Sequence, residues 1–424
     1  MINRKTAPKT EQISNLNLLQ PKELFLNNGA KLFIFKSDIT PVIKLDVIFK
    51  AGIEYETKKL QAVFANALIR EAPKGMDPDK TSEFFDYYGC HIESFTSNDT
   101  AGFRLYVPNK FIDEVLPVFA DLLINPSLPL KEFEILKSKY FETLKNSMTK
   151  TKNVAMRGLN TELFGKSHPR GFEIIPEDVN LLSIEDIKKF VKQNYAISDS
   201  IIQISGMVND KIITLCNKVF ITKTSISNKY KKALEIQESK NKSRFFEMND
   251  SVQSSIYIGK NLGKISHEEL IDMDILNTVL GGYFGSRLMK NIREDKGYTY
   301  GIGSFLSEYN DCVVLKITSD VGVDVTQNAI DEIFKEIKIL TEKRIHYQEL
   351  NLVRNYMLGE MLSSFDGVFQ ISAIWEKLIT TNKSPQFILN QVNRIKSISP
   401  KELFSISNKF LKNIDFHTVV AGKC

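Results

Sequence analysis

Hydrophobic and charged residues alternate along the segment from Pro41 to Gly52, PVIKLDVIFKAG. Apolar side chains occupy positions 43, 45, 47 and 49, whereas charged side chains occupy positions 44, 46 and 50. This period of two predicts a strand with one buried and one wet face, as in an antiparallel sheet backed by helices. The dipeptide Asn28-Gly29, between two apolar runs, predicts a β-hairpin just before that strand. A further short strand is predicted from Phe103 to Val107.

A helical period follows in FIDEVLPVFADLLINPSL, where apolar residues at positions 112, 115, 116, 119 and 122 form one stripe. The stripe predicts a helix packed against the sheet. The second half of the chain repeats this order, with strand-like segments at 255–259, 298–305 and 313–317 and a helical segment at 267–280. Between them, GGYFGSRLMKNIREDKG predicts a glycine-rich turn, a helix from about Ser286 and a glycine C-cap at Gly297.

The two halves end alike, in the segments Ser183–Gly206 and Ser399–Gly422, which have the same length. Each begins with a serine cap followed by an acidic residue, continues with one apolar helix face, and ends with an apolar strand and a glycine. The match predicts an α+β fold of two homologous units of about 200 residues, each an antiparallel-rich mixed sheet backed by helices. We expect a first unit at 1–222, a polar basic linker at 223–244 and a second unit at 245–424.

The linker also explains the charge of the chain. The chain of 424 residues is 42% hydrophobic and 25% charged, with a formal net charge of +5. Residues 223–244 hold seven Lys or Arg and two Glu, a balance of +5, so the remainder is neutral. Nucleic-acid binding is therefore not expected, because a basic groove should not be confined to one connector.

The cellular location is predicted from the apolar runs and the cysteines. No apolar run approaches the roughly 18 residues needed to span a bilayer, and the first residues lack the apolar core of a secretory signal. We expect a cytoplasmic protein without a membrane span, or a periplasmic one if a leader was removed. The four cysteines, at 90, 216, 312 and 424, show no C-x-x-C spacing and are expected to be reduced thiols.

The duplicated unit and the segment GGYFGSRLMKNIREDKGYTYGIGSF resemble the insulinase, pitrilysin and mitochondrial-processing-peptidase family. The resemblance extends over essentially the whole chain and includes the NNG hairpin, the segment Val42–Gly75, the NPS helix end and the repeat endings. It implies that the two units, joined by the linker, form one half of a clamshell and that each unit faces its counterpart in a partner. In the family, an inverted zinc motif, H-x-x-E-H, provides two histidine ligands and a glutamate base, with a distant glutamate as third ligand.

The zinc motif itself is degenerate in this chain. By the resemblance, Val63 stands at the first histidine, Asn66 at the glutamate and Ala67 at the second histidine, within LQAVFANALI. Valine and alanine donate no lone pair, and a neutral amide is too weak a base. Neighbouring histidines are all more than about 70 residues apart, so no helix can present two of them, and Glu142 is the one acidic residue in the FETL segment where the third ligand should fall. We expect no metal in this chain.

The other half of the family's site is retained. The resemblance implies that Arg293 and Tyr300 face the zinc across a closed chamber, hold the substrate peptide and stabilise the oxyanion. Tyr298 is expected to share the strand face of Tyr300 and to contact substrate as well. Arg287 is the alternative arginine, with a structural ion pair as its predicted role. Without the resemblance, the Arg-Tyr pair would be two surface residues beside a turn.

Two functions from different classes follow. The first is the non-catalytic subunit of a heterodimeric zinc metalloendopeptidase, which binds peptide or unfolded protein and completes the active site of a homologous H-x-x-E-H partner that carries the zinc. The second is a catalytically silent structural or peptide-binding homologue, like the core subunits of a respiratory complex. A homodimer of the chain alone stays open. A serine or cysteine hydrolase is not expected, because no G-x-S-x-G elbow is present.

Overall fold

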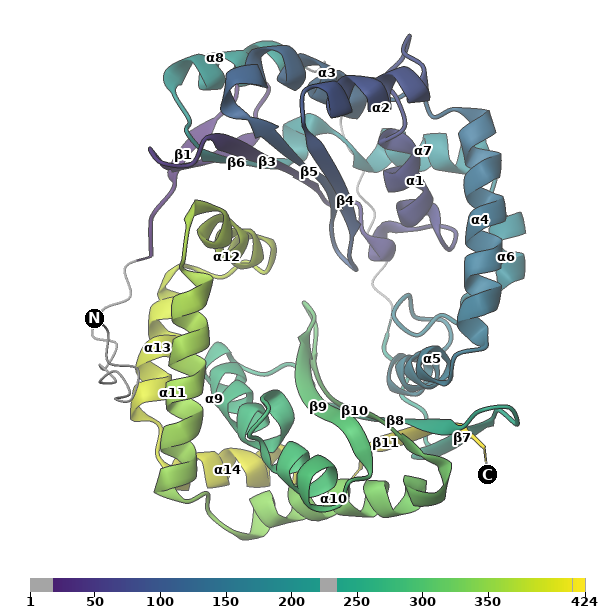
Figure 1. The fold of residues 1–424 in the computed structure, drawn as a ribbon, viewed down its shortest axis with the longest axis vertical. Helices are drawn as coiled ribbons and strands as arrows, with labels where there is room; N and C mark the ends of the chain where they lie inside the picture. Colours follow the sequence, from purple (N-terminus) through teal and green to yellow (C-terminus); the bar gives the residue numbers. More distant parts are fainter. Residues whose placement is uncertain (1–17, 222–234, 414, 424) are drawn as a thin grey trace, which may run out of the picture.

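The computed structural model describes residues 18–221, 235–413 and 415–423, which form two β-sheets with their helices (Figure 1). The strands and α-helices of the first half are β1 Lys22–Phe25, β2 Lys31–Lys36, β3 Val42–Phe49, α1 Gln61–Ile69, α2 Pro78–Tyr87, β4 His91–Thr96, β5 Ala101–Pro108, α3 Ile112–Ile124, α4 Leu130–Met148, α5 Thr151–Phe164, α6 Pro176–Asn180, α7 Ile184–Asn194, β6 Ile201–Gly206 and α8 Asp210–Val219. Those of the second half are β7 Ser243–Glu247, β8 Gln253–Asn261, α9 His267–Asn277, β9 Thr299–Glu308, β10 Val313–Gly322, α10 Thr326–Glu342, α11 Tyr347–Ser364, α12 Val368–Thr380, α13 Gln386–Ser397, α14 Pro400–Phe410 and β11 His417–Gly422. Two π-helical segments, η4 Thr278–Gly282 and η5 Met289–Asp295, lie between α9 and β9.

The two sheets have related topologies. The first has the strand order β1-β2-β6-β3-β5-β4 and the second β7-β11-β8-β10-β9. One pair in each sheet is parallel, β2 with β6 and β11 with β7, whereas the other pairs are antiparallel. The predicted α+β class with two antiparallel-rich mixed sheets is confirmed, and so is the hairpin at Asn28-Gly29.

The repeat at the end of each half is also present in three dimensions. Ser183 caps α7 in a capping box with Asp186, and Ser399 caps α14 in a capping box with Glu402. Each helix is followed by a central strand, β6 in the first sheet and β11 in the second. Because a capping box satisfies backbone N–H groups at a helix start, the same local chemistry begins the same helix-strand unit twice.

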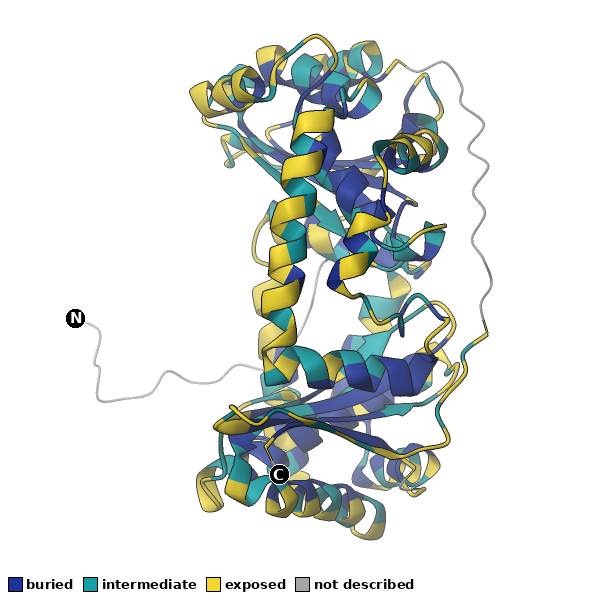
Figure 2. Ribbon diagram, turned by 90° about the vertical axis from the view of Figure 1, so that its right-hand side faces the viewer, coloured by how far each residue is buried: buried dark blue, intermediate teal, exposed yellow. Residues whose placement is uncertain are grey.

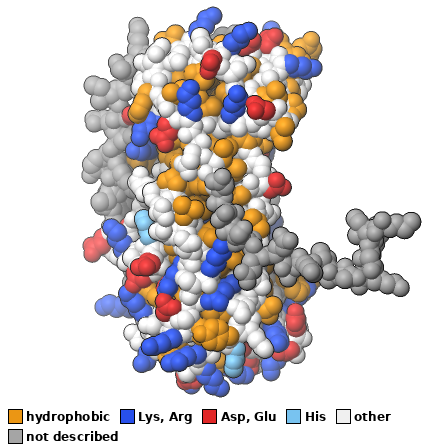
Figure 3. Space-filling view, turned by 90° about the vertical axis from the view of Figure 1, so that its left-hand side faces the viewer, with side chains coloured by type: hydrophobic (Ala, Val, Ile, Leu, Met, Phe, Trp, Pro, Cys, Tyr) orange, Lys and Arg blue, Asp and Glu red, His pale blue; other side chains and the backbone are white. Residues whose placement is uncertain are grey.

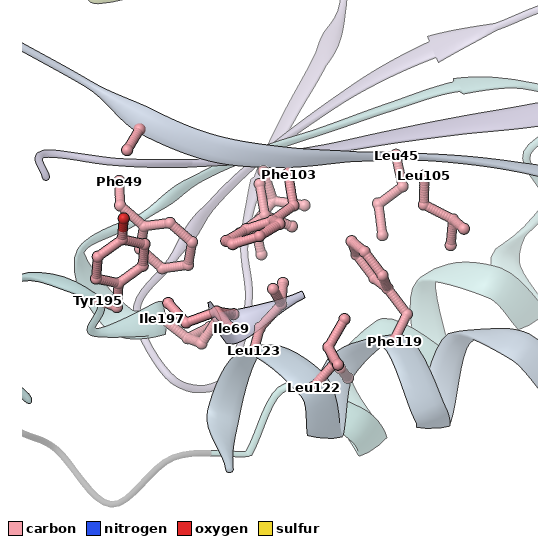
Figure 4. Close-up of a cluster of buried hydrophobic side chains, with 14 of the residues drawn as sticks. Leu45, Phe49, Ile69, Phe103, Leu105, Phe119, Leu122, Leu123, Tyr195 and Ile197 are labelled. Carbon is pink, nitrogen blue, oxygen red and sulfur yellow. The ribbon is translucent and has the colours of Figure 1, made fainter. Parts of the chain in front are cut away.

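The core of the first unit lies between its sheet and the helices α1 and α3 (Figure 4). Large side chains from the strands meet side chains from the helices and from the loop after α7, and all are buried; among them are Leu45, Phe49, Phe103, Leu105, Ile69, Phe119, Leu122, Leu123, Tyr195 and Ile197. Burying one such side chain stabilises the fold by about 1.5–3 kcal/mol. This layer fixes α1 relative to the sheet.

The predicted wet face of β3 is wrong. Lys44 is 2% exposed and Asp46 is 0% exposed, because α12 of the second half packs across β6 and β2 on that side of the sheet. The Lys44 ammonium donates to the Ser372 hydroxyl of α12 at 3.0 Å. Arg104 of β5 pairs with Asp46 at 2.5 Å and with Glu376 of α12 at 2.8 Å. Lys44 and Asp46 are therefore buried and pair with each other at 3.0 Å, whereas Lys50, which follows β3, is exposed.

Each half of the chain contributes one helix that packs on the sheet of the other half, α12 on the first sheet and α5 on the second. Helix α5 of the first half packs against β8 and β11 of the second sheet, where it lies across the strands (Figure 2). Its approach is close at Gly158, where a β-carbon would lie 2.5 Å from the Phe246 ring. The two sheets are thus held together by a helix from each half.

A buried ionic cluster joins the two halves near the end of α5. Arg170 donates to Glu54 of the first half at 2.5 Å and pairs with Asp311 of the β9–β10 turn at 2.6 Å. Its guanidinium also lies 4.3 Å from the ring of Tyr309. Together with α5 and α12, this cluster makes the two units one body.

The predicted domain limits fall partly outside the described residues. Most of the linker at 223–244 belongs to the undescribed range 222–234, and β7 begins at Ser243, inside the predicted linker. The limits at 222 and 245 stay a prediction.

The surface carries charges of both signs. In the view of Figure 3, Lys and Arg side chains are interspersed with Asp and Glu, and hydrophobic side chains lie between them. No helix among the described residues is long and apolar enough to cross a membrane. The cytoplasmic location stays a prediction.

Candidate functional site

Arg293 and Tyr300 are brought together by the turn that the glycine pattern predicted. The helical segment η5 ends before Gly297, whose φ of +67° lies in the left-handed region that glycine favours. The Tyr298 amide then donates to the Ile292 carbonyl at 3.0 Å, and β9 begins at the next residue. As a result, the Arg293 guanidinium carbon lies 5.2 Å from the centre of the Tyr300 ring.

The Arg293 side chain makes no hydrogen bond or ion pair with another side chain in the described ranges. Arg287, six residues earlier, differs: it makes a two-pronged ion pair with Glu349, with distances of 2.7 and 2.8 Å. The predicted structural role of Arg287 agrees with this geometry. Because a guanidinium always carries its charge and five donors, Arg293 offers an unused cationic donor group.

Tyr300 projects into solvent from the start of an edge strand, with 91% of its surface exposed. Its backbone is fixed by the preceding residue, because the Thr299 hydroxyl donates to the Asp320 carbonyl at 2.6 Å and lies 3.0 Å from the Gly301 amide. The pairing of β9 with β10 is irregular at this point, between Ser319 and Val321. Such irregularities often re-aim a side chain, and the exposed Tyr300 lies at this one.

Tyr298 does not share the environment of Tyr300. It precedes β9 and is half-buried against the hydrophobic core of the second unit. The predicted common strand face is therefore not formed, because Tyr298 belongs to the turn and not to the strand. Its contact with substrate stays a prediction.

The positions predicted for the zinc motif lie on α1 and have structural contacts. Val63 and Ala67 are partly buried, and Asn66 is 3% exposed. The Asn66 amide nitrogen donates to the carbonyls of Phe95 at 2.8 Å and Gly102 at 3.3 Å, which belong to β4 and β5. Its amide oxygen accepts a hydrogen bond from the Tyr195 hydroxyl at 3.3 Å. Asn66 thus ties α1 to the edge of the first sheet.

These residues do not fit a zinc ion. Two of the three positions lack a donor atom, and the amide of the third is occupied by its bonds to the sheet. No group of three or more His, Cys, Asp or Glu side chains with metal-binding geometry occurs in the described part of the chain. Glu142, at the position expected for a third ligand, is an exposed residue of α4.

Of the histidines expected in strands, His91 is exposed in β4 and lies 3.5 Å from Glu93. His417 is buried in β11, where its ring nitrogens contact the Lys242 ammonium and the Asn241 carbonyl, each at 3.0 Å. Both have ordinary structural partners.

The start of α1 depends on the carboxyl group of Glu56. Its two oxygens accept from the backbone amides of Leu60 at 3.1 Å and Ala62 at 2.8 Å. Leu60 has a φ of +72°, an unfavourable value for a residue with a β-carbon. Burial raises the pKa of Glu56 to about 8, although the two amide bonds favour its charged form and lower the pKa.

Stability should therefore depend on pH through Glu56. A carboxyl with a raised folded-state pKa binds its proton more tightly when folded, so stability falls as the pH rises from about 4.5 to about 8. We expect the melting temperature to fall by several degrees over this range, and Glu56→Gln to lose most of that dependence. The test is differential scanning fluorimetry of both proteins in matched buffers. Equal slopes for the two proteins would contradict the assignment.

Comparison with known proteins identifies the fold. The family model described as insulinase, peptidase family M16, matches residues 32–170, and the model described as the peptidase M16 inactive domain matches residues 182–357. The chain belongs to peptidase family M16. The predicted family is confirmed, and the second model covers the half that contains Arg293 and Tyr300.

Relatives in this M16 family have mixed names. An "uncharacterized zinc protease YmxG" of Bacillus subtilis is 22% identical over 381 residues, covering 88% of this chain and 92% of its own. A "non-peptidase homolog YmxG" of Helicobacter pylori is 20% identical over 349 residues, covering 78% of each chain. The crystal structure of a peptidase M16 inactive domain from Pseudomonas fluorescens superposes with a TM-score of 0.84 at 20% identity, covering 96% of this chain and 99% of its own. The chain is thus an M16 homologue of the inactive type.

Sequence patterns did not point to Phe284 or Thr299. Phe284 lies in the glycine-rich turn, and its ring centre is 4.5 Å from the Arg293 guanidinium carbon. Its high exposure is unusual for a phenylalanine, but exposure is not visible in a sequence. Thr299 could have been noticed as a β-branched residue between two tyrosines, although its hydrogen bonds depend on the bulge.

Proposed function

We propose that this chain is the non-catalytic subunit of a two-chain zinc metalloendopeptidase, and that it completes the active site of a homologous partner that carries H-x-x-E-H. The contrast between two parts of the molecule carries the proposal. Arg293 is a guanidinium without a carboxylate partner in the described ranges, next to an exposed phenol. At the predicted zinc-motif positions, Asn66 is instead buried and hydrogen-bonded to Phe95, and Val63 and Ala67 are partly buried.

The chemistry of the pair suits a site of peptide-bond cleavage. The partner's zinc would supply the activated water. Arg293 would donate to the oxygen of the scissile carbonyl, and Tyr300 would add a second directed donor, so that both act where negative charge develops. Neither group can perform hydrolysis alone, since neither provides a nucleophile at neutral pH.

The substrate would be an extended peptide or an unfolded protein segment. Tyr300 is the second residue of β9, which is the edge strand of the second sheet, and an edge strand can accept a further strand through its backbone groups. Strand addition would place the peptide backbone beside the Arg-Tyr pair. Most of the binding would then come from main-chain hydrogen bonds, with little dependence on sequence.

The test is reconstitution with an H-x-x-E-H homologue encoded by the same genome. We expect the chain alone to bind no stoichiometric zinc and to cleave no internally quenched peptide, whether it runs as a monomer or a homodimer in size-exclusion chromatography. Mixing should give a complex with zinc and with cleavage above that of the homologue alone. Stoichiometric zinc and cleavage in the isolated chain would refute the proposal, and a mixture no faster than the homologue would favour the silent structural or peptide-binding alternative.

A further inference from the structure

Arg293 contacts a second aromatic ring besides Tyr300. Its guanidinium carbon lies 4.5 Å from the centre of the Phe284 ring and 5.2 Å from that of Tyr300. Contacts of this length between a guanidinium and an aromatic ring are favourable, because the ring face carries negative charge. We call Phe284 and Tyr300 the aromatic pair.

The turn that carries Phe284 is fixed against the strand that carries Tyr300. At Gly281 a β-carbon would lie 2.6 Å from the Ser304 hydroxyl of β9, so the backbone approaches the strand closely. The Asn277 side-chain amide donates to the Ser304 carbonyl at 3.2 Å. Within the turn, the Ser286 backbone amide donates to the Tyr283 carbonyl at 3.1 Å. The turn that carries Phe284 is therefore attached to β9, the strand that carries Tyr300.

Phe284 is 62% exposed, so burial in the core does not explain the position of its ring. Arg287 is held by the two-pronged carboxylate of Glu349, but Arg293 has no such partner among the described residues. A long side chain without a partner samples many rotamers, and ordering it on binding costs affinity. Stacking on aromatic rings can order a guanidinium without occupying its N–H donors.

We infer that Phe284 is a positioning residue for Arg293. Its ring, together with Tyr300, holds the guanidinium in place while the N–H edge stays available for a substrate carbonyl. This inference rests on the proposed function, in which Arg293 acts on a peptide held by the two-chain complex. A carboxylate in place of Phe284 would also order Arg293, but it would occupy the donors that the substrate needs.

The experiment is a double-mutant cycle in the reconstituted two-chain complex, with an internally quenched peptide as probe. We expect Phe284→Ala to lower kcat/KM about 2- to 5-fold, the range of an exposed cation–π contact. Phe284→Leu should lower it equally, since leucine lacks the ring, and Phe284→Tyr should restore it. In an Arg293→Ala background, Phe284→Ala should change kcat/KM less than about 1.5-fold, because its effect passes through Arg293.

Phe25→Ala is the matched control. Phe25 is an exposed phenylalanine of β1 that lies 6.0 Å from the Lys31 ammonium, in the other sheet, and its loss should leave kcat/KM unchanged. Wild-type activity of Phe284→Ala, or an equal loss in the Arg293→Ala background, would overturn the inference. If Arg293→Ala lowers activity in the same series, the proposed function survives that failure. If Arg293→Ala itself has no effect, the proposed function and this inference fall together. Melting temperatures of all variants identify any loss caused by unfolding.

Discussion

Replacing Arg293 with alanine is expected to lower kcat of the reconstituted two-chain peptidase by about 100- to 1,000-fold. The loss follows from removing a preorganised cationic donor aimed at the oxygen on which charge develops. The donor is preorganised because Gly297 ends the helix and the aromatic pair contacts the guanidinium. Since the interaction strengthens as charge forms, kcat should fall more than KM rises.

The measurement is a steady-state comparison with two further variants. Arg293→Lys keeps the charge but loses the forked donors, so we expect an intermediate loss. Lys290→Ala removes an exposed cation from the same helical segment and should leave kcat within about 2-fold. Full kcat for Arg293→Ala would refute the proposed role, and an equal loss for Lys290→Ala would show that net charge matters more than geometry.

The features that the sequence predicts correctly are those that depend on neighbouring residues in the chain. The capping boxes at Ser183 and Ser399, the hairpin at Asn28-Gly29 and the helix end at Gly297 all follow from residues within a few positions of one another. Local backbone preferences determine them, so a single sequence suffices. The family resemblance then suggested what local patterns could not, namely the clamshell arrangement and the proposed roles of Arg293 and Tyr300.

Features that depend on distant contacts were missed. Lys44 and Asp46 have the pattern of a wet face, but a helix more than 300 residues later covers them and provides Ser372 and Glu376 as partners. The spacing of Tyr298 and Tyr300 predicts that both lie on one face of a strand, but β9 starts at Thr299, so Tyr298 lies outside it. The sequence indicates only that Asn66 stands where the family has a glutamate, because its bonds to Phe95 and Gly102 depend on the register of β4 and β5.

Asn66 therefore has a structural role, because it attaches α1 to the first sheet. The substitution Asn66→Asp tests this role with almost no change in side-chain size. The substitution replaces an N–H donor by a carboxylate oxygen that faces the carbonyls of Phe95 and Gly102 in a buried site. We expect it to lower the free energy of unfolding at pH 8 by about 3–5 kcal/mol, the usual loss when a buried charge is left without a partner. Urea denaturation followed by circular dichroism measures this difference.

The pH dependence separates this mechanism from a packing defect. A carboxyl that faces two carbonyls has a raised pKa in the folded state, so it is protonated at acidic pH and can donate one hydrogen bond again. The free energy of unfolding of Asn66→Asp should then be closest to that of the wild type at pH values below the ordinary aspartate pKa. It should fall further below the wild-type value as the pH rises through the raised pKa of the folded state. Val63→Ala, on the partly buried side of the same helix, should cost about 1 kcal/mol at every pH. A constant deficit for Asn66→Asp would show that α1 is held by packing alone, whereas a pH-dependent one would explain why a charged base at position 66 is incompatible with this chain.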